Sequence, residues 1–598
     1  MARHRVSEPA VRNAAPPLAR TRAALLLALL LPAGPALAQS ALERNLPPPV
    51  APRPAALTIG TADYGKGDDT PLGVNLAGVR LIGPDETVPA TAPRGVSISE
   101  VSGIAPQAVT AALSPYVGKP LTRGQIARMQ SELAGVWRRA GFPFVSVTVP
   151  PQEITSGVLS LRVVEFHAGQ VHVEGGSALE RNLAGRMRLE PGQRIDAGAI
   201  EEDLDWINRN PFRHVEGVFA PGDEKGASDI TLKVTEDKPF SVFGSHANTG
   251  SKATGMDRWS AGGGLWLPML NDMTLSYRFT RSGEFWDDGE VFKLDTGRPG
   301  YLSHSARIEL PTFDRQALSI APNFVETNEL VSGTPFSFDN TTFELPILYR
   351  SAISNILPGH YWGDIYFGVE PKWLKRTTAF AGVDVAKGEA NLFNLVFGWS
   401  DDFSDPYGRT SIDARVKANP GGVVSKNTAA DWTSFTGGRV DDDTYVTAGV
   451  DISRMTDLTH GFGWASQLSA LIAGQALPDS ERLSLGGFYA VRGYGSEDGA
   501  ADAGLVWRNE LRLPTYAPLT RAGMGVRDGL SPFLFVDLGH GYDFAVKDHT
   551  TLAATGVGFD YNIGANLAAS LTGAVALADA GDTRSGDTTL TANVRISY

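Results

Sequence analysis

The chain closes on Thr589-Leu590-Thr591-Ala592-Asn593-Val594-Arg595-Ile596-Ser597-Tyr598, a stretch in which polar and apolar residues alternate. Successive side chains of a β-strand point to opposite faces, so the apolar residues from Leu590 to Tyr598 share one face and the polar residues share the other. A strand with a lipid-facing side, a water-facing side and a terminal aromatic residue is typical of an outer-membrane β-barrel. The alternative interpretation is the edge strand of a soluble β-sandwich, and the preceding sequence decides between the two.

Residues 239–598 repeat this alternation in short segments separated by Gly, Asp, Asn and Pro. In one of them, Ile365 and Phe367 alternate with Asp364 and Tyr366. Candidate strands begin near residues 241, 258, 272, 303, 315, 338, 361, 390, 408, 443, 461, 504, 530, 549, 565 and 588. Sixteen such segments fit the even strand number of bacterial barrels, and closure leaves no unpaired backbone facing hydrocarbon. We therefore predict a mainly β fold, with a 16-stranded transmembrane barrel over residues 239–598.

The N-terminus has the features of a secretory signal over residues 1–38. Arginines precede the apolar run 23–31, and Ala36-Leu37-Ala38 offers a cleavage site before Gln39. A transmembrane anchor is the weaker alternative, because this run is too short to cross about 30 Å of hydrocarbon as a helix. No later run of about 18 apolar residues follows, so the exported chain is expected to be soluble or barrel-forming.

Composition limits the possible functions. The 598 residues carry a net charge of -13 and only 20% charged residues, which argues against a nucleic-acid partner. The chain has no cysteine and therefore no disulfide, thiol nucleophile or thiolate metal site. His167 and His172 are interpreted as surface residues, so we expect no metal and no cofactor. No G-x-S-x-G turn or convincing acid pair suggests an enzyme.

Two similar modules are expected between the signal peptide and the barrel. A tether at 39–75 comprises a short helical stretch at 40–46 and a Pro-rich segment. The order strand–helix–helix–strand–strand then occurs twice, at 76–166 and at 168–236. The expected strands are 79–82, 144–149, 158–164, 171–175, 215–220 and 229–234, and the expected helices are 106–116, 123–140, 178–189 and 197–208.

The helix expected at 197–208 has a recognisable start. Asp196 is a candidate cap, and Glu201, Glu202 and Asp203 are assigned to the favourable first turn. Pro211 stops this helix, so the stretch 208–212 is interpreted as a helix-ending turn rather than a binding motif.

Three stretches carry a family resemblance: Val491-Arg492-Gly493-Tyr494, Phe535-Val536-Asp537-Leu538-Gly539 and Asn208-Arg209-Asn210-Pro211-Phe212-Arg213. With the tandem modules and the barrel, they make the chain resemble the TpsB transporters of two-partner secretion in the Omp85 superfamily. The resemblance covers essentially the whole mature chain. It implies that 76–166 and 168–236 are POTRA domains in the periplasm and that 239–598 is an outer-membrane barrel.

The same resemblance implies that the Gly-rich loop near 486–504 folds into the barrel lumen. Asp537, Phe535 and Gly539 share the inward parity of their strand, so the loop residue Arg492 can pair with the Asp537 carboxylate. Gly493 and Gly539 would allow close approach, and Tyr494 would pack against the wall. The alternative is a solvated Arg492 and an ordinary lumen carboxylate.

Other residues receive secondary assignments. Arg508, Glu510 and Arg512 alternate with apolar residues and are candidates for the lumen wall. The strand ending at Tyr598 is the expected signal to the barrel assembly machinery, and lipid is expected around the barrel.

The resemblance implies export of a large unfolded TpsA-type partner, such as a hemolysin, adhesin or toxin, that meets the POTRA domains by strand addition. The alternatives are an Omp85-type insertase, a passive porin and, least supported, an outer-membrane enzyme. Two modules and a tether favour secretion. TpsB proteins typically plug the pore with an N-terminal helix, whereas the only candidate here is the short stretch at 40–46.

Overall fold

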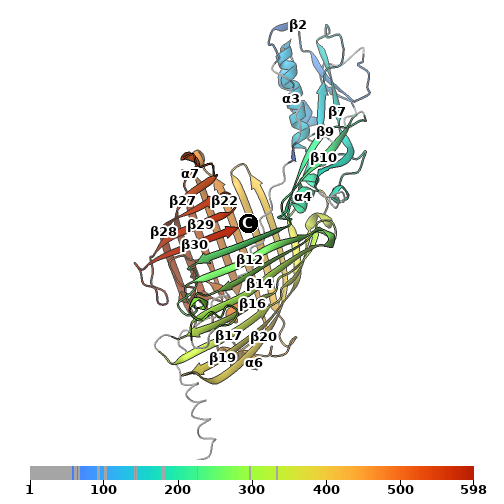
Figure 1. The fold of residues 1–598 in the computed structure, drawn as a ribbon. Helices are drawn as coiled ribbons and strands as arrows, with labels where there is room; N and C mark the ends of the chain where they lie inside the picture. The colour runs from blue at the N-terminus through green and yellow to red at the C-terminus, as the bar shows by residue number, and fades with distance from the viewer. Residues whose placement is uncertain are drawn as a thin grey trace, which may run out of the picture.

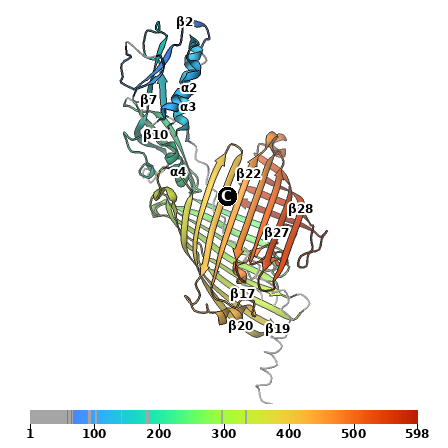
Figure 2. The same cartoon turned by 180° about the vertical axis from the view of Figure 1, so that it is seen from behind.

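Two small α/β units project in a row from one end of a closed barrel (Figure 1, Figure 2). The computed structural model describes residues 57–598 except 59–63, 65–66, 90–93, 100–103, 141, 143, 177–182, 225, 295–297 and 332–333. The expected signal peptide, the short helix at 40–46 and much of the tether lie outside the described residues. Among the residues described, no helix is long and apolar enough to cross a membrane.

The first unit is a four-stranded sheet, in the order β4-β3-β7-β6, with two helices packed against it. Its elements are β2 (Pro71–Asn75), β3 (Gly78–Ile82), β4 (Gly95–Ile98), α2 (Pro106–Leu113), η1 (Ser114–Tyr116), β5 (Pro120–Thr122), α3 (Arg123–Arg139), β6 (Val145–Thr148) and β7 (Val158–Glu165). The expected strands and helices are present, and β4 is an additional strand. Because β2 pairs with β5, ordered structure begins inside the segment expected to be a tether.

Helix α3 supplies much of the core of this unit. It begins where the Thr122 hydroxyl accepts a hydrogen bond from the Gln125 amide at 2.9 Å, as a capping side chain does. Met129, Leu133 and Trp137 recur every four residues and are fully buried. The Trp137 indole donates to Glu165 of β7 at 2.6 Å, so helix and sheet are fixed by both apolar packing and a hydrogen bond.

The second unit has the strand order β1-β9-β10-β8. Its elements are β1 (Leu57–Thr58), β8 (His167–Gly175), α4 (Ala197–Ile207), β9 (Arg213–Pro221) and β10 (Ala227–Glu236). Asp196 caps α4 by accepting from Gly198 and Ala199, at 3.0 and 3.2 Å.

Two expectations about this unit were wrong in detail. Only one 3-10 turn, at 183–186, occupies the described part of the helix expected at 178–189. The backbone N–H of Arg188 donates to the Asp203 carboxylate at 2.7 Å instead of to a helical carbonyl. Because α4 begins at Ala197, none of Glu201, Glu202 and Asp203 lies in its first turn, and Glu202 and Asp203 are buried.

The barrel closes with sixteen antiparallel strands, as predicted. The strand segments are β11 (Phe240–Ala247), β12 (Arg258–Leu267), β13 (Met273–Arg281), β14 (Gly300–Pro311), β15 (Gln316–Ile320), β16 (Asn323–Leu330), β17 (Phe336–Glu344), β18 (Ile347–Ala352), β19 (Asp364–Phe380), β20 (Val383–Asp405), β21 (Gly408–Asn419), β22 (Tyr445–Asp457), β23 (Gly463–Ala473), β26 (Ala503–Arg512), β27 (Asp528–Asp543), β28 (Asp548–Ile563), β29 (Leu567–Ala576) and β30 (Thr588–Ser597). Segments β15 and β16 both pair with β14, and β17 and β18 both pair with β19, so each pair of segments forms one barrel strand. Pro322 and Pro346 lie at the two interruptions, where proline cannot donate to the ladder.

The last strand closes the barrel as its alternation predicted. Strand β30 pairs with β11, and the Tyr598 amide donates to the Val242 carbonyl at 2.9 Å. Leu590, Ile596 and Tyr598 are exposed on the outer face, whereas Arg595 lines the interior. The lipid-facing and lumen-facing sides therefore follow the period of two.

The connections alternate between the two ends of the barrel. The turns at 268–272, 312–315 and 353–363 lie at the end that carries the α/β units, whereas the loops at 248–257 and 474–502 and residues 282–294 lie at the far end (Figure 1). The connections contain η3 (Pro268–Leu270), α5 (Phe285–Asp288), η4 (Ile353–Asn355), α6 (Ala429–Thr436), η5 (Thr459–Gly461), η6 (Asp479–Glu481), β24 (Leu483–Ser484), η7 (Ser496–Asp498), β25 (Ala500–Ala501) and α7 (Pro518–Arg521).

Candidate functional site

The loop between β23 and β26 folds into the barrel. Its short strands β24 and β25 pair with each other, which forms a hairpin inside the loop. Leu485, Val491 and Tyr494 are buried in one cluster with Leu552 and Ala554 of β28. The loop is therefore packed against the inner wall rather than spread over the mouth.

Arg492 of this loop makes a two-pronged ion pair with Asp537 of β27. Its Nε lies 2.7 Å from Oδ2 and its Nη2 lies 2.8 Å from Oδ1, while its backbone amide donates to Oδ2 at 3.2 Å. The Asp537 side chain is fully buried, because its parity turns it inward while Val536 and Leu538 face outward. This fork geometry gives the strongest kind of carboxylate contact available to arginine.

Two further groups fix the Arg492 guanidinium. Its Nη1 donates to Glu510 of β26 at 2.7 Å, and its plane lies 3.8 Å from the centre of the Phe535 ring. We call this set, Arg492 with Asp537 and Glu510, the loop contact. Arg508 lies 4.0 Å from Asp537, and Arg512 lies 2.7 Å from Glu510, so both belong to the surrounding charged wall.

The neighbouring motif residues make close backbone approaches possible. Gly493 has a φ of +96°, and a side chain at Gly539 would begin 2.9 Å from the Val491 Cγ2 atom. The Tyr494 hydroxyl lies 2.8 and 2.9 Å from the carbonyl oxygens of Ala578 and Ala553. The structure thus brings both sequence motifs together at one point of the wall.

A second ionic cluster holds the base of the loop, and sequence reasoning missed it. Arg439 donates to Asp502 at 2.9 Å and to Asp543 at 3.1 Å, and Arg482 ion-pairs with both of these carboxylates. Arg439 belongs to the neighbouring connection at 420–444. No spacing rule links residues this far apart, so only the fold reveals the cluster.

The second α/β unit contacts the rim of the barrel through charged residues. Asp203 of α4 accepts from Arg188 within its own unit at 2.9 Å and from Arg315 in a barrel turn at 3.0 Å. Burial raises the pKa of the Asp203 carboxyl, and the guanidinium groups of Arg188 and Arg315 oppose that shift. Glu202 also hydrogen-bonds to Ser354 of the next turn.

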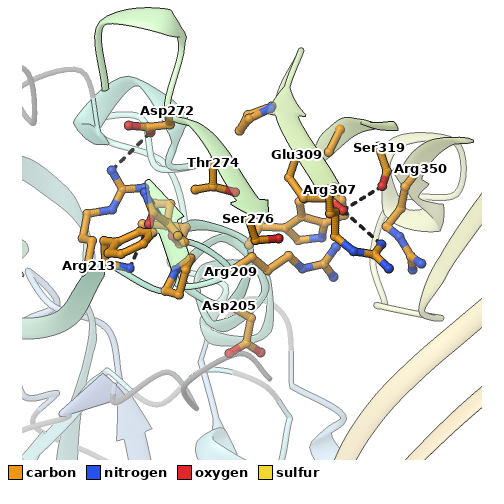
Figure 3. A pocket seen from close by; sticks show the side chains of 18 of the residues that line it. Asp205, Arg209, Arg213, Asp272, Thr274, Ser276, Arg307, Glu309, Ser319 and Arg350 are labelled. Atoms are coloured by element: carbon orange, nitrogen blue, oxygen red, sulfur yellow. Dashed lines mark hydrogen bonds and ion pairs between the residues drawn. The ribbon is translucent and has the colours of Figure 1, made fainter. Parts of the chain in front are cut away.

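The stretch 208–213 completes this attachment, although it was expected to be only a helix-ending turn. Arg209 pairs with Asp364 at 2.7 Å, and the buried Arg213 pairs with Asp272 at 3.1 Å (Figure 3). The Phe212 ring reaches Gly264 of β12, where an added Cβ would lie 3.0 Å from it. We call these contacts of α4 and residues 208–213 with the barrel turns the rim contact.

The rim contact borders a large water-accessible cavity. A cavity of about 1790 Å³ opens between α4 and the barrel interior, and it is lined by charged residues including Arg209, Arg307, Glu309 and Arg350 (Figure 3). A second cavity of about 1230 Å³ lies beside the inward-folded loop and is lined by Arg492 and Tyr489. Charged and polar side chains therefore contribute to the lining of both cavities.

The comparisons with known proteins agree with this architecture. Residues 366–561 match the haemolysin secretion/activation proteins ShlB/FhaC/HecB, and residues 92–165 match the ShlB-type POTRA domain. The outer membrane transporter CdiB-2 of Burkholderia pseudomallei (strain 1026b) is 23% identical over 444 residues, which are 71% of this chain and 69% of that protein. The heme/hemopexin transporter protein HuxB of Haemophilus influenzae is 25% identical over 153 residues, 25% of this chain and 27% of that protein.

Solved structures show the same fold. CdiB from Escherichia coli aligns with a TM-score of 0.62 and 16% identity, covering 98% of this chain and all of that chain. CdiB from Acinetobacter baumannii aligns with a TM-score of 0.55 and 16% identity, covering 97% of this chain and 98% of that chain. The chain is an outer-membrane β-barrel with periplasmic POTRA domains. Its barrel and its first α/β unit carry the two matches to the haemolysin secretion/activation family, the TpsB transporters.

Proposed function

We propose that this protein exports a large, unfolded partner protein from the periplasm to the cell surface through the barrel lumen. The observation that carries the proposal is a loop held inside a closed 16-stranded barrel by Arg492 and Asp537, with POTRA domains attached at the opposite mouth. A polar interior suits an extended polypeptide, whose backbone groups need hydrogen-bonding partners throughout. A passive porin would leave the attached periplasmic units without a role.

The POTRA sheets supply a means of meeting an unfolded partner. An extended peptide can add to a sheet edge through main-chain hydrogen bonds, which recognise extended shape more than sequence. In this structure Leu57 and Thr58 already pair with Gly217 and Val218 at the edge of β9. That edge accepts an extended segment of this chain, so we propose that the partner adds to the POTRA sheets in the same way.

The loop contact is proposed to control the lumen. Arg492 is tied to two neighbouring strands, β26 and β27, so the loop position depends on a few directional bonds. A desolvated ion pair holds its geometry, but losing one partner leaves an unpaired buried charge. The motif residues Val491, Gly493, Tyr494, Phe535 and Gly539 would act by shaping the surface against which the loop rests.

We further propose that the protein acts without a catalytic site or cofactor and that folding of the partner outside the cell drives export. The strand ending at Tyr598 would be recognised by the barrel assembly machinery, and lipid would surround the outer face. The partner would be of the TpsA type.

An export assay tests the proposal. Partner protein is measured in the medium and on the surface of cells that produce wild-type protein, Arg492→Ala or Asp537→Ala. The matched control is Arg454→Ala, which breaks an ion pair of 2.7 Å with Asp405 at residues that line neither cavity. We expect export to fall at least tenfold in the two loop-contact variants while the control stays near wild type.

Two results would contradict the proposal. Unchanged export with a folded Arg492→Ala barrel would remove the loop contact from the mechanism. Deletion of the protein that leaves partner export intact but impairs assembly of other membrane proteins would favour the insertase alternative.

A further inference from the structure

The loop that follows β13 folds back over the outer, lipid-facing surface of the barrel. On β13, Ser276 and Arg278 line the interior, whereas Phe279, which has the opposite parity, points outward. Phe279 pairs with Ala261 of β12, and Trp259 lies two residues from Ala261. Trp259 therefore points outward, on the same side as Phe279. Trp286 in the loop lies 5.3 Å from Trp259, and Phe292 lies 5.5 Å from Phe279, measured between ring centres.

A buried arginine holds the loop in this position. Arg281 has the same outward parity as Phe279, yet it is only 1% exposed because residues 282–294 cover it. Its guanidinium donates to the carbonyl oxygens of Val291 and Lys293 and lies 3.6 Å from the Glu284 carboxylate. The loop thus removes a cation from the outer surface and gives it two backbone oxygens and a carboxylate as partners, which lowers the cost of a charge next to hydrocarbon.

The covering loop presents apolar side chains in place of that cation. Trp286 is 65% exposed and Phe292 is 72% exposed, while Val291 beside them is 38% exposed. Leu294 of the loop and Leu302 of β14 are buried. Neighbouring exposed aromatic side chains of this kind are costly in water and mark an interaction surface.

The height of this surface matches the outer half of the membrane. Phe279 lies six residues beyond Met273, the start of β13 at the periplasmic end. At about 3.4 Å per residue and a tilt of about 40°, that is a rise of about 15 Å within an apolar band about 25 Å tall. Trp286 and Phe292, which stack on these outward residues, are therefore level with the outer leaflet and its interface.

We propose that residues 282–294 form a lipid-binding surface that inserts Trp286, Val291 and Phe292 among the acyl chains of the outer leaflet. The surface is continuous with the lipid-facing band of β12–β14, which makes lipid its natural occupant. Aromatic side chains are favoured at this depth because one part is apolar while the rest tolerates the headgroup region. The loop thereby anchors the barrel wall beside the closing strands β11 and β30.

The absence of native cysteine allows a direct test with single-cysteine variants. Phe292→Cys is labelled with nitrobenzoxadiazole, and the protein is reconstituted into phosphatidylethanolamine–phosphatidylglycerol vesicles. The matched control is Tyr489→Cys, an aromatic position inside the lumen that is 74% exposed, close to Phe292. Folding of each variant is checked by its electrophoretic shift on heating.

A probe at position 292 should be quenched at least twofold more than one at 489 by lipids with nitroxide on the acyl chain, and correspondingly less by iodide in water. Equal iodide quenching at both positions, or quenching of 292 by iodide alone, would overturn the proposal. Trp286→Cys provides a second position, which must show the same pattern. None of these readouts depends on export, so their failure would leave the proposed transport function untouched.

Discussion

The loop contact and the rim contact use the same chemistry at opposite ends of the barrel. Both join a piece of chain that is not part of the wall to the wall itself, through arginine and carboxylate. In the loop contact Arg492 and Asp537 have 4% and 0% exposed side chains. In the rim contact Arg209 keeps 30% exposure and Arg315 keeps 11%, Arg213 is buried, and the attachment is spread over several barrel turns.

This difference separates two physical roles. A fully desolvated pair is stable only in a narrow range of geometries. Removing one partner is costly, because the remaining charge stays buried and is not solvated by water. Partly solvated pairs each contribute less, and several must be lost before an attachment fails. The loop should therefore behave as a single-point lock, and the second POTRA unit as a graded attachment.

The largest expected effect comes from removing one member of the loop contact. Arg492→Ala or Asp537→Ala should lower the free energy of unfolding of the barrel by about 3–5 kcal/mol, since each leaves a buried charge unpaired. Urea titration in lipid vesicles measures the loss. The double variant should be less destabilised than the sum of the two single variants, and strict additivity would show that the two residues are not coupled.

The rim contact should break less completely. Asp272→Ala removes the partner of Arg213, which is almost fully buried, and of Arg186, so we expect a loss of about 2–3 kcal/mol in the attachment of the second POTRA unit. Hydrogen exchange of α4 should rise while the barrel strands stay protected. Asp314→Ala, at an exposed residue of the next rim turn, serves as the control and should change nothing. Faster hydrogen exchange of β27 in the Asp272 variant would contradict the independence of the rim contact and the loop contact.

Two glycines sharpen the comparison further. Gly493 in the loop has a φ of +96°, so Gly493→Ala should cost about 1 kcal/mol through backbone strain. A Cβ at Gly264 would meet the end of the Phe212 ring at 3.0 Å and the Ser241 hydroxyl at 3.2 Å, and both side chains can shift, so Gly264→Ala should cost a few tenths of a kcal/mol. Thermal melting of both variants in the same detergent shows which one loses more stability. A larger loss for Gly264→Ala would contradict the proposal that the loop contact is stricter than the rim contact.

The smallest effect is expected from salt. Raising ionic strength from 0.1 M to 1 M shortens the screening length from about 10 Å to about 3 Å, which weakens the partly exposed rim pairs and hardly affects the buried loop contact. Protease cleavage between the POTRA units and the barrel should therefore become faster with salt. Wild-type channel conductance, corrected for bulk conductivity, should show no new open state. A new open state of the channel at high salt would show that the loop contact is accessible to water and is screened by salt.

Local sequence predicted the secondary structure well wherever one side of an element faces a uniform environment. The alternation from Leu590 to Tyr598 needs only lipid on one side and water on the other, and all sixteen strands followed from the same rule. The start of β20 was misplaced by seven residues, at 390 instead of Val383. Its first five residues are all exposed, so neither face is buried and burial does not alternate along them.

Residues that depend on distant partners were harder to interpret. Parity alone turned Asp537 inward, but only the family resemblance brought Arg492 to it. Residues 208–212 were expected to end a helix, which they do, and nothing in the spacing of 208–213 predicted contacts with Asp272, Asp364 and Gly264 of the barrel. Close to the 3-10 turn at 183–186, the Arg188 backbone N–H likewise donates to Asp203. That partner is 15 residues away, too far for a local sequence pattern to predict.

By itself, the sequence determined the membrane-spanning wall, because the pleat and the two solvents act on each strand separately. It also determined the order of the domains, since each module repeats its own local pattern. Only the tertiary structure decided which charges meet: the loop contact and the rim contact join residues far apart in the chain, and Arg281 is covered by the loop that folds back over it. The physical reason is that burial of a charge depends on everything packed around it, whereas alternation depends only on the strand.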